Sequence, residues 1–314
     1  MKTIKFNTNP SISIIVPCYN EENMIDIFLD RLYPILDELD NGYEIIFVND
    51  GSTDNTFKVM LHSKNKHKNI RILNFSRNFG KEAALTAGLE NAKCDATILI
   101  DVDLQHPPEL IPIFIEKWEE GYDVVAGKRI NRTGEHSLKK LSAKLFYKIH
   151  NSISDITIPN DIGDFRLISR KVVDALSKLP ENQRFMKGIF AWVGYKTAVV
   201  EYKQEHRVAG KSNFSGWKLW NFALDGITSF STVPLRIWLY IGIIISFISF
   251  IIGLTIIIKT LIYGIELPGY VSLFSMILFL GGIQLIGIGI LGEYIGRIYK
   301  ESKRRPSYII EDEY

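Results

Sequence analysis

Two aspartates that lie two residues apart carry the clearest chemical signal in the sequence. Asp101 and Asp103 directly follow the apolar stretch ATILI at residues 96–100. In an extended segment, side chains two residues apart project from the same face, so both carboxylates can act on one ligand. Carboxylate oxygens suit a hard divalent cation, Mg²⁺ or Mn²⁺, which usually also holds phosphate oxygens of a substrate. Gln105 continues the alternation, so Asp101, Asp103 and Gln105 are the predicted metal ligands.

The alternative for this segment is a solvated acidic turn, because Asp-x-Asp triplets also occur by chance. Its place between an apolar stretch and the loop-forming Pro107-Pro108 favours the metal site. His106 lies in the same loop and is expected at the surface rather than among the ligands.

Two further polar clusters follow apolar stretches in the same way. Tyr19-Asn20-Glu21 follows ISIIVP at 12–17, and Asn49-Asp50-Gly51-Ser52 follows YEIIFV at 43–48. If these stretches are neighbouring parallel strands, the clusters meet the aspartates at the carboxyl edge of the sheet, where such sheets bind ligands. The sequence has no GxGxxG and no GxxxxGK[ST], so dinucleotide redox chemistry and P-loop hydrolysis lack support.

The elements that must position these clusters alternate between apolar β-branched stretches and helical patterns. This alternation predicts an α/β fold with a mostly parallel, three-layer sheet. The expected strands are 12–17, 43–48, 70–75, 96–100 and 123–126, and the expected helices are 21–39, a helix from near Thr53, and 81–92.

Composition narrows the function classes. The chain has 314 residues and a formal net charge of +2, so a protein that binds nucleic acid through bulk positive charge is not expected. Two cysteines, Cys18 and Cys94, cannot form a disulfide framework, which indicates a reduced, cytosol-facing protein.

Two uncharged apolar segments stand near the C-terminus, at 237–258 and 267–292. A helix that crosses the hydrocarbon core needs roughly 20 apolar residues, so both are predicted to span a membrane. The alternative is a pair of buried core helices, but such helices rarely run this long without a polar face. Residues 214–233 mix tryptophans with few charges. They suit a helix in the membrane interface, with an amphipathic helix packed on the soluble domain as the alternative.

The distribution of lysine and arginine predicts the orientation. The short connection at 263–268 contains none, although Lys259 lies just before it. The positive-inside rule therefore places the segment after the second span, and the large N-terminal part, in the cytoplasm. No long apolar run begins the chain, so no cleavable signal peptide is expected. The basic residues after the second span are Arg297, Lys300, Lys303, Arg304 and Arg305.

Five motifs together resemble one family. They are PCYNE at 17–21, NDGSTDNT at 49–56, NFGKEAAL at 78–85, DVDLQHPPE at 101–109 and GDFRLISR at 163–170. With these motifs the chain resembles the inverting glycosyltransferases of family 2. With its two C-terminal spans it resembles, more narrowly, the polyprenyl-phosphate glycosyltransferases, such as dolichol-phosphate mannose synthases and bactoprenol glucosyltransferases.

The resemblance implies a GT-A nucleotide-sugar fold and a role for individual residues. Asp103 is implied as the principal metal ligand, and Asp164 as a catalytic carboxylate that acts as a base or positions a substrate. Asp161 is the neighbouring rival of Asp164. The residues implied to bind the nucleotide sugar are Pro17, Tyr19, Glu21, Asp50, Lys81, Asp101 and Val102.

Cations are needed where a lipid phosphate approaches a pyrophosphate that is already negative. Arg129, Arg207 and Lys211 are the predicted contacts to the acceptor phosphate. The family's R-x-x-G-x-S-K stretch reads RVAGKSN here, so Asn213 replaces its last lysine and Lys211 is the nearest substitute. For these three cations the alternative is ordinary solvated surface charge.

The resemblance implies transfer of a hexose, glucose from UDP-glucose, to undecaprenyl phosphate with inversion. The alternatives are an inactive nucleotide-binding membrane scaffold, and a processive polysaccharide synthase, whose QxxRW motif is absent. The GxxxG formed by Gly292 and Gly296 indicates a homo-oligomer, with a tetramer as one arrangement. The alternative is that these small residues only pack the two spans together. The expected location is the cytoplasmic (inner) membrane, multi-pass, with the catalytic domain in the cytoplasm. The expected units are a GT-A domain at 1–212, an interfacial segment at 213–234, two transmembrane helices at 235–296 and a cytoplasmic tail at 297–314.

Overall fold

The computed structural model describes residues 10–39, 42–130, 151–154, 156–157, 162–182, 184–203, 226–264 and 269–314. Within them, one eight-stranded sheet has the order β7-β5-β6-β4-β1-β2-β3-β8. The strands β1 to β4 run parallel to one another, and β5 runs parallel to β7. β6 is antiparallel to β4 and β5, and β8 is antiparallel to β3. The strands are β1 (Ile12–Cys18), β2 (Tyr43–Asn49), β3 (Ile70–Phe75), β4 (Ala96–Leu99), β5 (Val124–Arg129), β6 (Ile162–Ser169), β7 (Thr197–Tyr202) and β8 (Ile310–Glu313).

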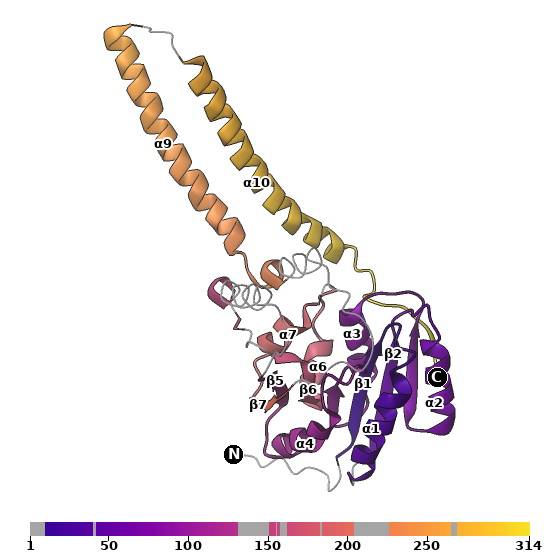
Figure 1. The fold of residues 1–314 in the computed structure, drawn as a ribbon. Coiled ribbons are helices and arrows are strands. Elements are labelled where there is room, and N and C mark those ends of the chain that lie inside the picture. The colour runs from indigo at the N-terminus through magenta and orange to yellow at the C-terminus, as the bar shows by residue number, and fades with distance from the viewer. Residues whose placement is uncertain are drawn as a thin grey trace.

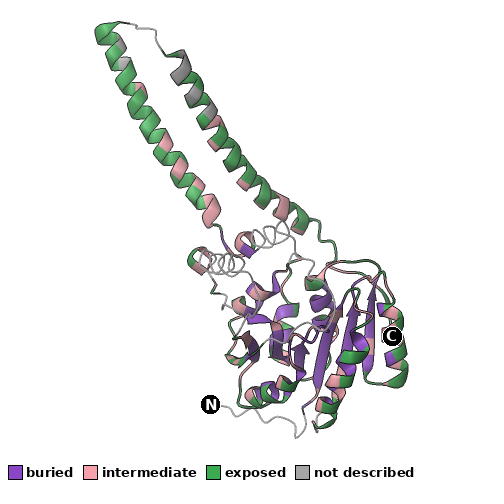
Figure 2. Cartoon of the chain, viewed as in Figure 1, coloured by how far each residue is buried: buried purple, intermediate pink, exposed green. Residues whose placement is uncertain are grey.

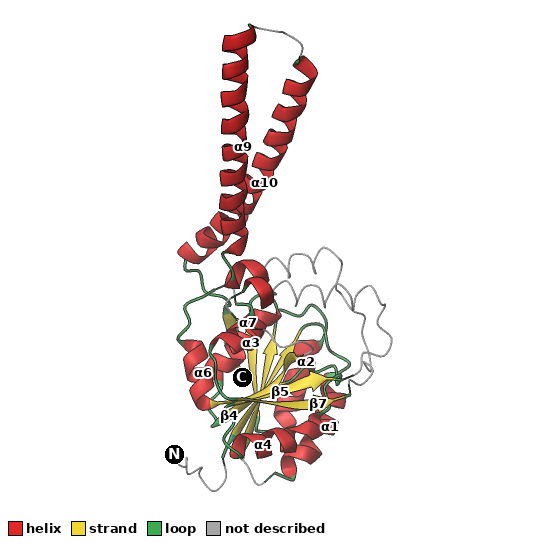
Figure 3. Ribbon diagram, turned by 90° about the vertical axis from the view of Figure 1, so that its left-hand side faces the viewer, coloured by secondary structure: helices red, strands yellow, loops and turns green. Residues whose placement is uncertain are grey.

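Helices cover both faces of this sheet (Figures 1 and 3). One face packs on α1 (Ile25–Asp37), α2 (Thr56–Lys66) and α4 (Ile111–Glu119), through side chains such as Phe28 and Phe114. The other face packs on α3 (Lys81–Asn91), α6 (Arg170–Ser177) and α7 (Met186–Trp192), through side chains such as Leu85 and Ile189. Strands buried on both faces read as continuous apolar runs, which is why β1, β2 and β4 stand out in the sequence.

The predicted mostly parallel α/β sheet is confirmed, and each of the five expected strands is present. Three strands were not predicted. Polar residues interrupt β6, most of β7 alternates between exposed and partly buried residues, and β8 reads IEDE, so none of the three is a long, fully buried apolar run. Two helices also begin later than expected, α1 at Ile25 and α2 at Thr56, because the residues before them form loops at the carboxyl edge of the sheet.

The two apolar segments form a long helical hairpin that projects from the sheet domain (Figure 1). Its helices are α9 (Val233–Tyr263) and α10 (Tyr270–Ser302), and both are long and apolar enough to cross a membrane. Large apolar side chains along the hairpin are exposed, for example Phe250 and Leu285, each at 69% (Figure 2). Such a continuous apolar surface is unfavourable in water and suits contact with lipid.

The predicted cytoplasmic tail at 297–314 is divided between the end of a helix and a strand. Residues 297–302 continue α10, and β8 pairs with the outer edge of β3. Tyr308 stacks on Phe75 with ring centroids 5.2 Å apart, and the side chain of Glu313 accepts a 2.6 Å bond from Arg71. Residues 310–313, which were expected in a separate tail, therefore form a strand of the catalytic sheet. Three of the four residues of β8 are acidic, so the strand has no apolar pattern from which it could have been predicted.

Of the predicted interfacial segment, residues 213–225 lie outside the described residues. Residues 226–230 are helical and lead into α9. The hydroxyl of Tyr294 in α10 donates to the carbonyl oxygen of Ser231 at 2.7 Å, so the start of α9 is bonded to the lower part of α10.

Candidate active site

Two loops at the carboxyl edge of the sheet are bonded to each other. The backbone amide of Asn20, after β1, donates to the Ser52 hydroxyl at 3.0 Å. The side-chain oxygen of Asn20 accepts from the Thr53 amide at 2.8 Å. The amide of Glu21 donates to the Thr56 hydroxyl at 2.8 Å, which also fixes the start of α2. The predicted convergence of the first two polar clusters is confirmed by these bonds and by the parallel pairing of β1 with both β2 and β4.

The NDGS turn is built against the loop that precedes α3. Gly51 has φ +61°, and a Cβ there would lie 2.3 Å from the carbonyl carbon of Arg77, so only glycine fits. Asp50 is buried, and its carboxylate accepts backbone hydrogen bonds from Phe79 at 2.6 Å and Gly80 at 3.0 Å. Burial raises the pKa of Asp50, and these two bonds oppose the rise. The carboxylate thus fixes the entry to α3, and its contact with a nucleotide stays a prediction.

Lys81, the first residue of α3, joins two carboxylates from different strands. Its Nζ lies 2.7 Å from Oδ1 of Asp101, which follows β4, and 2.9 Å from Oδ2 of Asp164 on β6. β6 pairs directly with β4, so the antiparallel strand that the sequence did not reveal is the element that brings Asp164 to this place. Three of the predicted site residues, Lys81, Asp101 and Asp164, thus form one cluster.

This cluster sets the protonation of its members. Burial favours the neutral carboxylic acid of Asp164, but the charge of Lys81 outweighs it and lowers the pKa of Asp164 to about 2. Burial of Asp101 is likewise outweighed, by the charge of Lys81 and by the interaction with His106, so its pKa lies well below the usual range. For Lys81, the two carboxylates overcome burial and raise its pKa. All three groups are therefore charged at neutral pH.

His106 is buried and only 1% exposed, so its expected place in a surface loop is wrong. Its Nδ1 lies 2.6 Å from the hydroxyl of Tyr202, and its Nε2 lies 3.6 Å from Oδ2 of Asp101. The guanidinium of Arg129 donates to the same Tyr202 hydroxyl at 3.4 Å. The histidine ring is held inside because it packs on Phe165 and Tyr202, two aromatic rings from strands that the sequence did not reveal. Arg129, a predicted acceptor contact, thus shares the Tyr202 hydroxyl with His106, whose other ring nitrogen faces Asp101.

The predicted metal ligands lie on one loop. Asp103 is buried, and its Oδ1 accepts from the backbone amide of Gln105 at 3.2 Å across a tight turn in which Leu104 has φ +56°. Val102 is buried in the core, so only its backbone can face a ligand. Among the described residues, no group of three His, Cys, Asp or Glu side chains forms a metal site on its own. One or two carboxylates suffice for a cation that also binds substrate phosphates, so Asp101 and Asp103 fit a hard divalent cation of that kind.

Two residues near Asp164 were not predicted, the buried Arg166 and the partly buried Glu82. Arg166 is 4% exposed, its Nη2 donates to the carbonyl oxygen of Gly163 at 2.6 Å, and its guanidinium carbon lies 3.8 Å from the ring centre of Phe190. Burial lowers the pKa of Arg166 to about 10. Burial, and then the charge of Asp164, raise the pKa of Glu82 to about 7. Arg166 lies in the motif GDFR and Glu82 in the motif GKEA, and these motifs were the signal in the sequence that could have identified them.

The remaining predicted residues are placed as follows. Tyr19 is 44% exposed after β1, and Pro17 and Glu21 are partly buried beside it. They lie at the same edge of the sheet, and their contacts with base and ribose stay predictions. Arg207, Lys211 and the rival carboxylate Asp161 lie outside the described residues.

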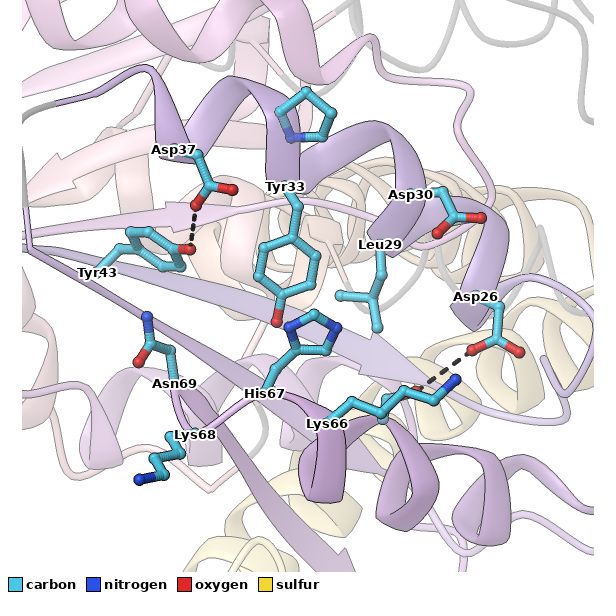
Figure 4. Close-up of a pocket in the computed structure, with 12 residues that line it drawn as sticks. Asp26, Leu29, Asp30, Tyr33, Asp37, Tyr43, Lys66, His67, Lys68 and Asn69 are labelled. Carbon is cyan, nitrogen blue, oxygen red and sulfur yellow. Dashed lines mark hydrogen bonds between the residues drawn. The ribbon is translucent and has the colours of Figure 1, made fainter.

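A separate groove of about 520 Å³ lies between α1 and the end of α2 (Figure 4). Within the groove, Asp37 accepts a hydrogen bond from the Tyr43 hydroxyl at 2.8 Å, and His67 stacks on Tyr33. None of the predicted site residues lines this groove. The chemistry therefore belongs to the carboxyl edge of the sheet and not to this surface.

Comparison with known proteins agrees with this geometry. Residues 13–177 match the model of glycosyl transferase family 2, and residues 233–298 match that of the GtrB C-terminal hairpin. A bactoprenol glucosyl transferase of Shigella phage SfV is 54% identical over 302 residues, which cover 96% of this chain and 98% of that protein. An uncharacterized glycosyltransferase of Synechocystis sp. is 50% identical over 301 residues, with 96% and 95% covered.

A solved structure shares the fold of the sheet domain. It is a glucosyl-3-phosphoglycerate synthase from Mycobacterium tuberculosis, in complex with Mn²⁺, UDP and phosphoglyceric acid, with a TM-score of 0.51 and 22% identity over 70% of this chain and 76% of that one. At this identity the likeness concerns the fold alone, which is the expected GT-A fold. The two family models, the relatives and the sheet together establish that the chain belongs to glycosyltransferase family 2, with the C-terminal hairpin of the GtrB group.

Proposed function

We propose that the protein transfers a hexose, glucose from UDP-glucose, to undecaprenyl phosphate with inversion at the anomeric carbon. The observation that carries this proposal is the identity of 52–54% with relatives named bactoprenol glucosyl transferases, which extends through the hairpin. The cluster of Lys81, Asp101 and Asp164 supports a catalytically competent enzyme rather than a scaffold, because it would be costly to keep charged and partly buried without a use.

The donor would lie across the carboxyl edge of β1, β2 and β4, with the nucleotide near Tyr19 and Asp50. Asp101 and Asp103 would hold a divalent cation, Mg²⁺ or Mn²⁺. When bound, this cation supplies Lewis-acid stabilisation of the departing nucleoside diphosphate. Lys81 adds a second positive charge beside Asp101, where negative charge develops on the leaving group.

Asp164 is proposed to act by position and charge, not as a general base. A phosphate monoester has a second pKa near 6, so the acceptor is largely a dianion at neutral pH and needs no base. A carboxylate with a pKa of about 2 is also a weak proton acceptor, whereas an efficient base has a pKa near the working pH. Its negative charge suits stabilisation of the positive sugar in an oxocarbenium-like transition state.

The acceptor phosphate would be met by cations, Arg129 in the His106–Tyr202 network and the predicted contacts Arg207 and Lys211. The hairpin would anchor the enzyme in the cytoplasmic (inner) membrane as a multi-pass protein, with the sheet domain in the cytoplasm. A homo-oligomer is supported by Gly292 and Gly296, where an added Cβ would meet no atom within 4 Å in the described chain. Small residues of this kind let a helix of another copy approach closely.

The direct test is a transfer assay with the purified full chain in detergent. It would contain undecaprenyl phosphate, Mg²⁺ or Mn²⁺, and separate nucleotide sugars, with the lipid product identified by mass spectrometry. A hexosyl-phospholipid formed only with UDP-glucose is the expected result. Product from another donor would replace the sugar assignment, and donor hydrolysis without any lipid product would contradict the acceptor.

A further inference from the structure

A groove of about 990 Å³ lies where the foot of α10 meets the sheet domain. Its apolar surface includes Phe185 and Ile189 from the α7 region, Phe230 before α9, and Ile298 of α10. Ile298 is 67% exposed, so the groove opens beside the end of a membrane helix. The apolar surface of the hairpin therefore meets the apolar wall of the groove at Ile298.

The same groove carries positive charge. Arg297, Arg304 and Arg305 line it, and the acidic residues Glu181 and Glu301 oppose them. Arg297 is bonded to Ser229 at 3.1 Å. In the part of the chain that the structure describes, Arg304 and Arg305 have no ion-pair partner. Apolar walls with unpaired arginines at the level of the membrane surface fit the head group of an anionic lipid.

A second cavity of about 370 Å³ extends the groove toward the carboxylate cluster. It shares Asn182, Phe185, Ser229 and Arg297 with the groove, and its far wall contains Glu82. Glu82 follows Lys81 directly in α3, and its pKa responds to the charge of Asp164. The two cavities adjoin, and together their linings extend from the foot of α10 to Glu82, the residue next to Lys81 in the carboxylate cluster.

Side-chain alternation along β6 agrees with this arrangement. Phe165 and Leu167 belong to the core on the α1 and α4 side. Ile168 belongs to the core on the α3 and α7 side, so Asp164 and Arg166, which share its parity, project toward that same side. The groove lies on the α7 side as well, since Phe185 and Ile189 line it.

We infer that this groove receives the phosphate end of the polyprenyl phosphate acceptor, with its first isoprene units on the apolar wall and its phosphate at Arg304 and Arg305. The phosphate would then reach Asp164 through the second cavity, from the α3 and α7 side of the sheet. The inference rests on the proposed function, and it adds a docking site that precedes the contacts at Arg129.

The test uses the purified full chain in detergent with undecaprenyl phosphate as the probe. In the double variant Arg304→Glu/Arg305→Glu, kcat/KM for undecaprenyl phosphate should fall at least about tenfold, because two charge-assisted contacts to phosphate are lost. The affinity for the nucleotide sugar, measured by calorimetry, should be unchanged. Lys303→Glu is the matched control: Lys303 lies next to these arginines but over the Tyr299 ring and outside the groove. Ile298→Trp, at an exposed position, should also lower acceptor use by narrowing the groove.

The outcomes separate this inference from the proposed function. If the wild-type protein forms no polyprenyl-linked sugar, the proposed function fails. If the wild type is active and the double variant keeps its acceptor kcat/KM, or loses it only as much as Lys303→Glu does, the groove is not the docking site. Native mass spectrometry with phosphatidylglycerol and undecaprenyl phosphate supplies the last comparison. Equal loss of both lipids in the double variant would make the groove a general anionic-lipid site and overturn the assignment to the acceptor.

Discussion

The ammonium of Lys81 lies 2.9 Å from Oδ2 of Asp164, and this ion pair joins the first residue of α3 to the middle of the sheet. The two residues are 83 positions apart in the sequence. Their contact exists because β6 is inserted next to β4 with the opposite direction. The same ammonium also holds Asp101, so one side chain controls the charge state of two carboxylates.

Removing the positive charge at this position should change the pH dependence of transfer. In Lys81→Met, burial of Asp164 is no longer opposed by Lys81, so the pKa of Asp164 should rise from about 2. Because transfer needs the ionised carboxylate, the loss of activity on acidification should begin at a higher pH in Lys81→Met than in the wild type. The measurement is kcat/KM against pH from 4 to 8. Lys81→Arg keeps the charge and should keep the acidic limb in place; an identical profile for Lys81→Met would contradict the assignment.

Asp103→Asn should abolish most of the transfer activity. The substitution keeps the size of the side chain and removes a charged ligand, so a loss of about 100-fold or more in kcat is expected. The acceptor of the Gln105 amide bond is retained as the Asn side-chain oxygen, so the fold should persist. Thermal unfolding should therefore be near that of the wild type, while the concentration of Mn²⁺ needed for half-maximal activity should rise. Wild-type turnover after chelation would show that Asp103 is not a metal ligand.

Glu82→Gln should flatten the pH dependence of stability. The pKa of Glu82 is raised to about 7 from the ordinary value of 4.5, so the folded state holds a proton that the unfolded state has released. Stability from this group is complete below about pH 4.5 and is lost as the pH rises through 7. The wild-type Tm should fall between pH 5 and 8 as Glu82 ionises. In Glu82→Gln this contribution is absent, so its Tm should fall less over the same range. Glu119→Gln, at an exposed position on α4, is the control and should behave as the wild type does.

The C-terminal strand should contribute measurably to stability. Tyr308 stacks on Phe75, and its hydroxyl donates to Glu90 at 2.6 Å. Tyr308→Ala should lower the free energy of unfolding of the sheet domain by about 2 kcal/mol, while Tyr308→Phe, which keeps the ring, should cost about 1 kcal/mol or less. Thermal unfolding in detergent measures both. Equal stability of Tyr308→Ala and wild type would show that the strand is only loosely held.

The membrane orientation can be tested by cysteine labelling. Cys94 is partly exposed, so the background should be Cys94→Ser. Gly264 has φ +78°, where another residue is strained, and Tyr263, at 81% exposure, is the better position for a new cysteine. An impermeant thiol reagent should label Tyr263→Cys in intact cells and should not label Ser302→Cys. The reverse pattern would place the sheet domain on the side of the membrane that lacks nucleotide sugars.

The parts of the fold that the sequence predicted are those with a local pattern. β1, β2 and β4 are buried on both faces and read as apolar runs, and the aspartates directly after β4 follow from that position. β6 contains Asp164 and Arg166, which the site requires on the strand, so its apolar pattern is broken by the chemistry that it carries. The burial of His106 depends on Tyr202 and Phe165, which come from distant parts of the chain, and no local pattern reveals such a contact.

The pairing of β8 with β3 has a consequence for how the protein is made. The backbone of Tyr314, next to β8, exchanges two hydrogen bonds with Ile72, at 2.9 and 3.0 Å. These residues leave the ribosome after the hairpin, so the outer edge of β3 stays unpaired through synthesis and insertion of α9 and α10. An open strand edge is a template for pairing with other chains. The catalytic sheet can therefore close this edge only after both hairpin helices have been synthesised.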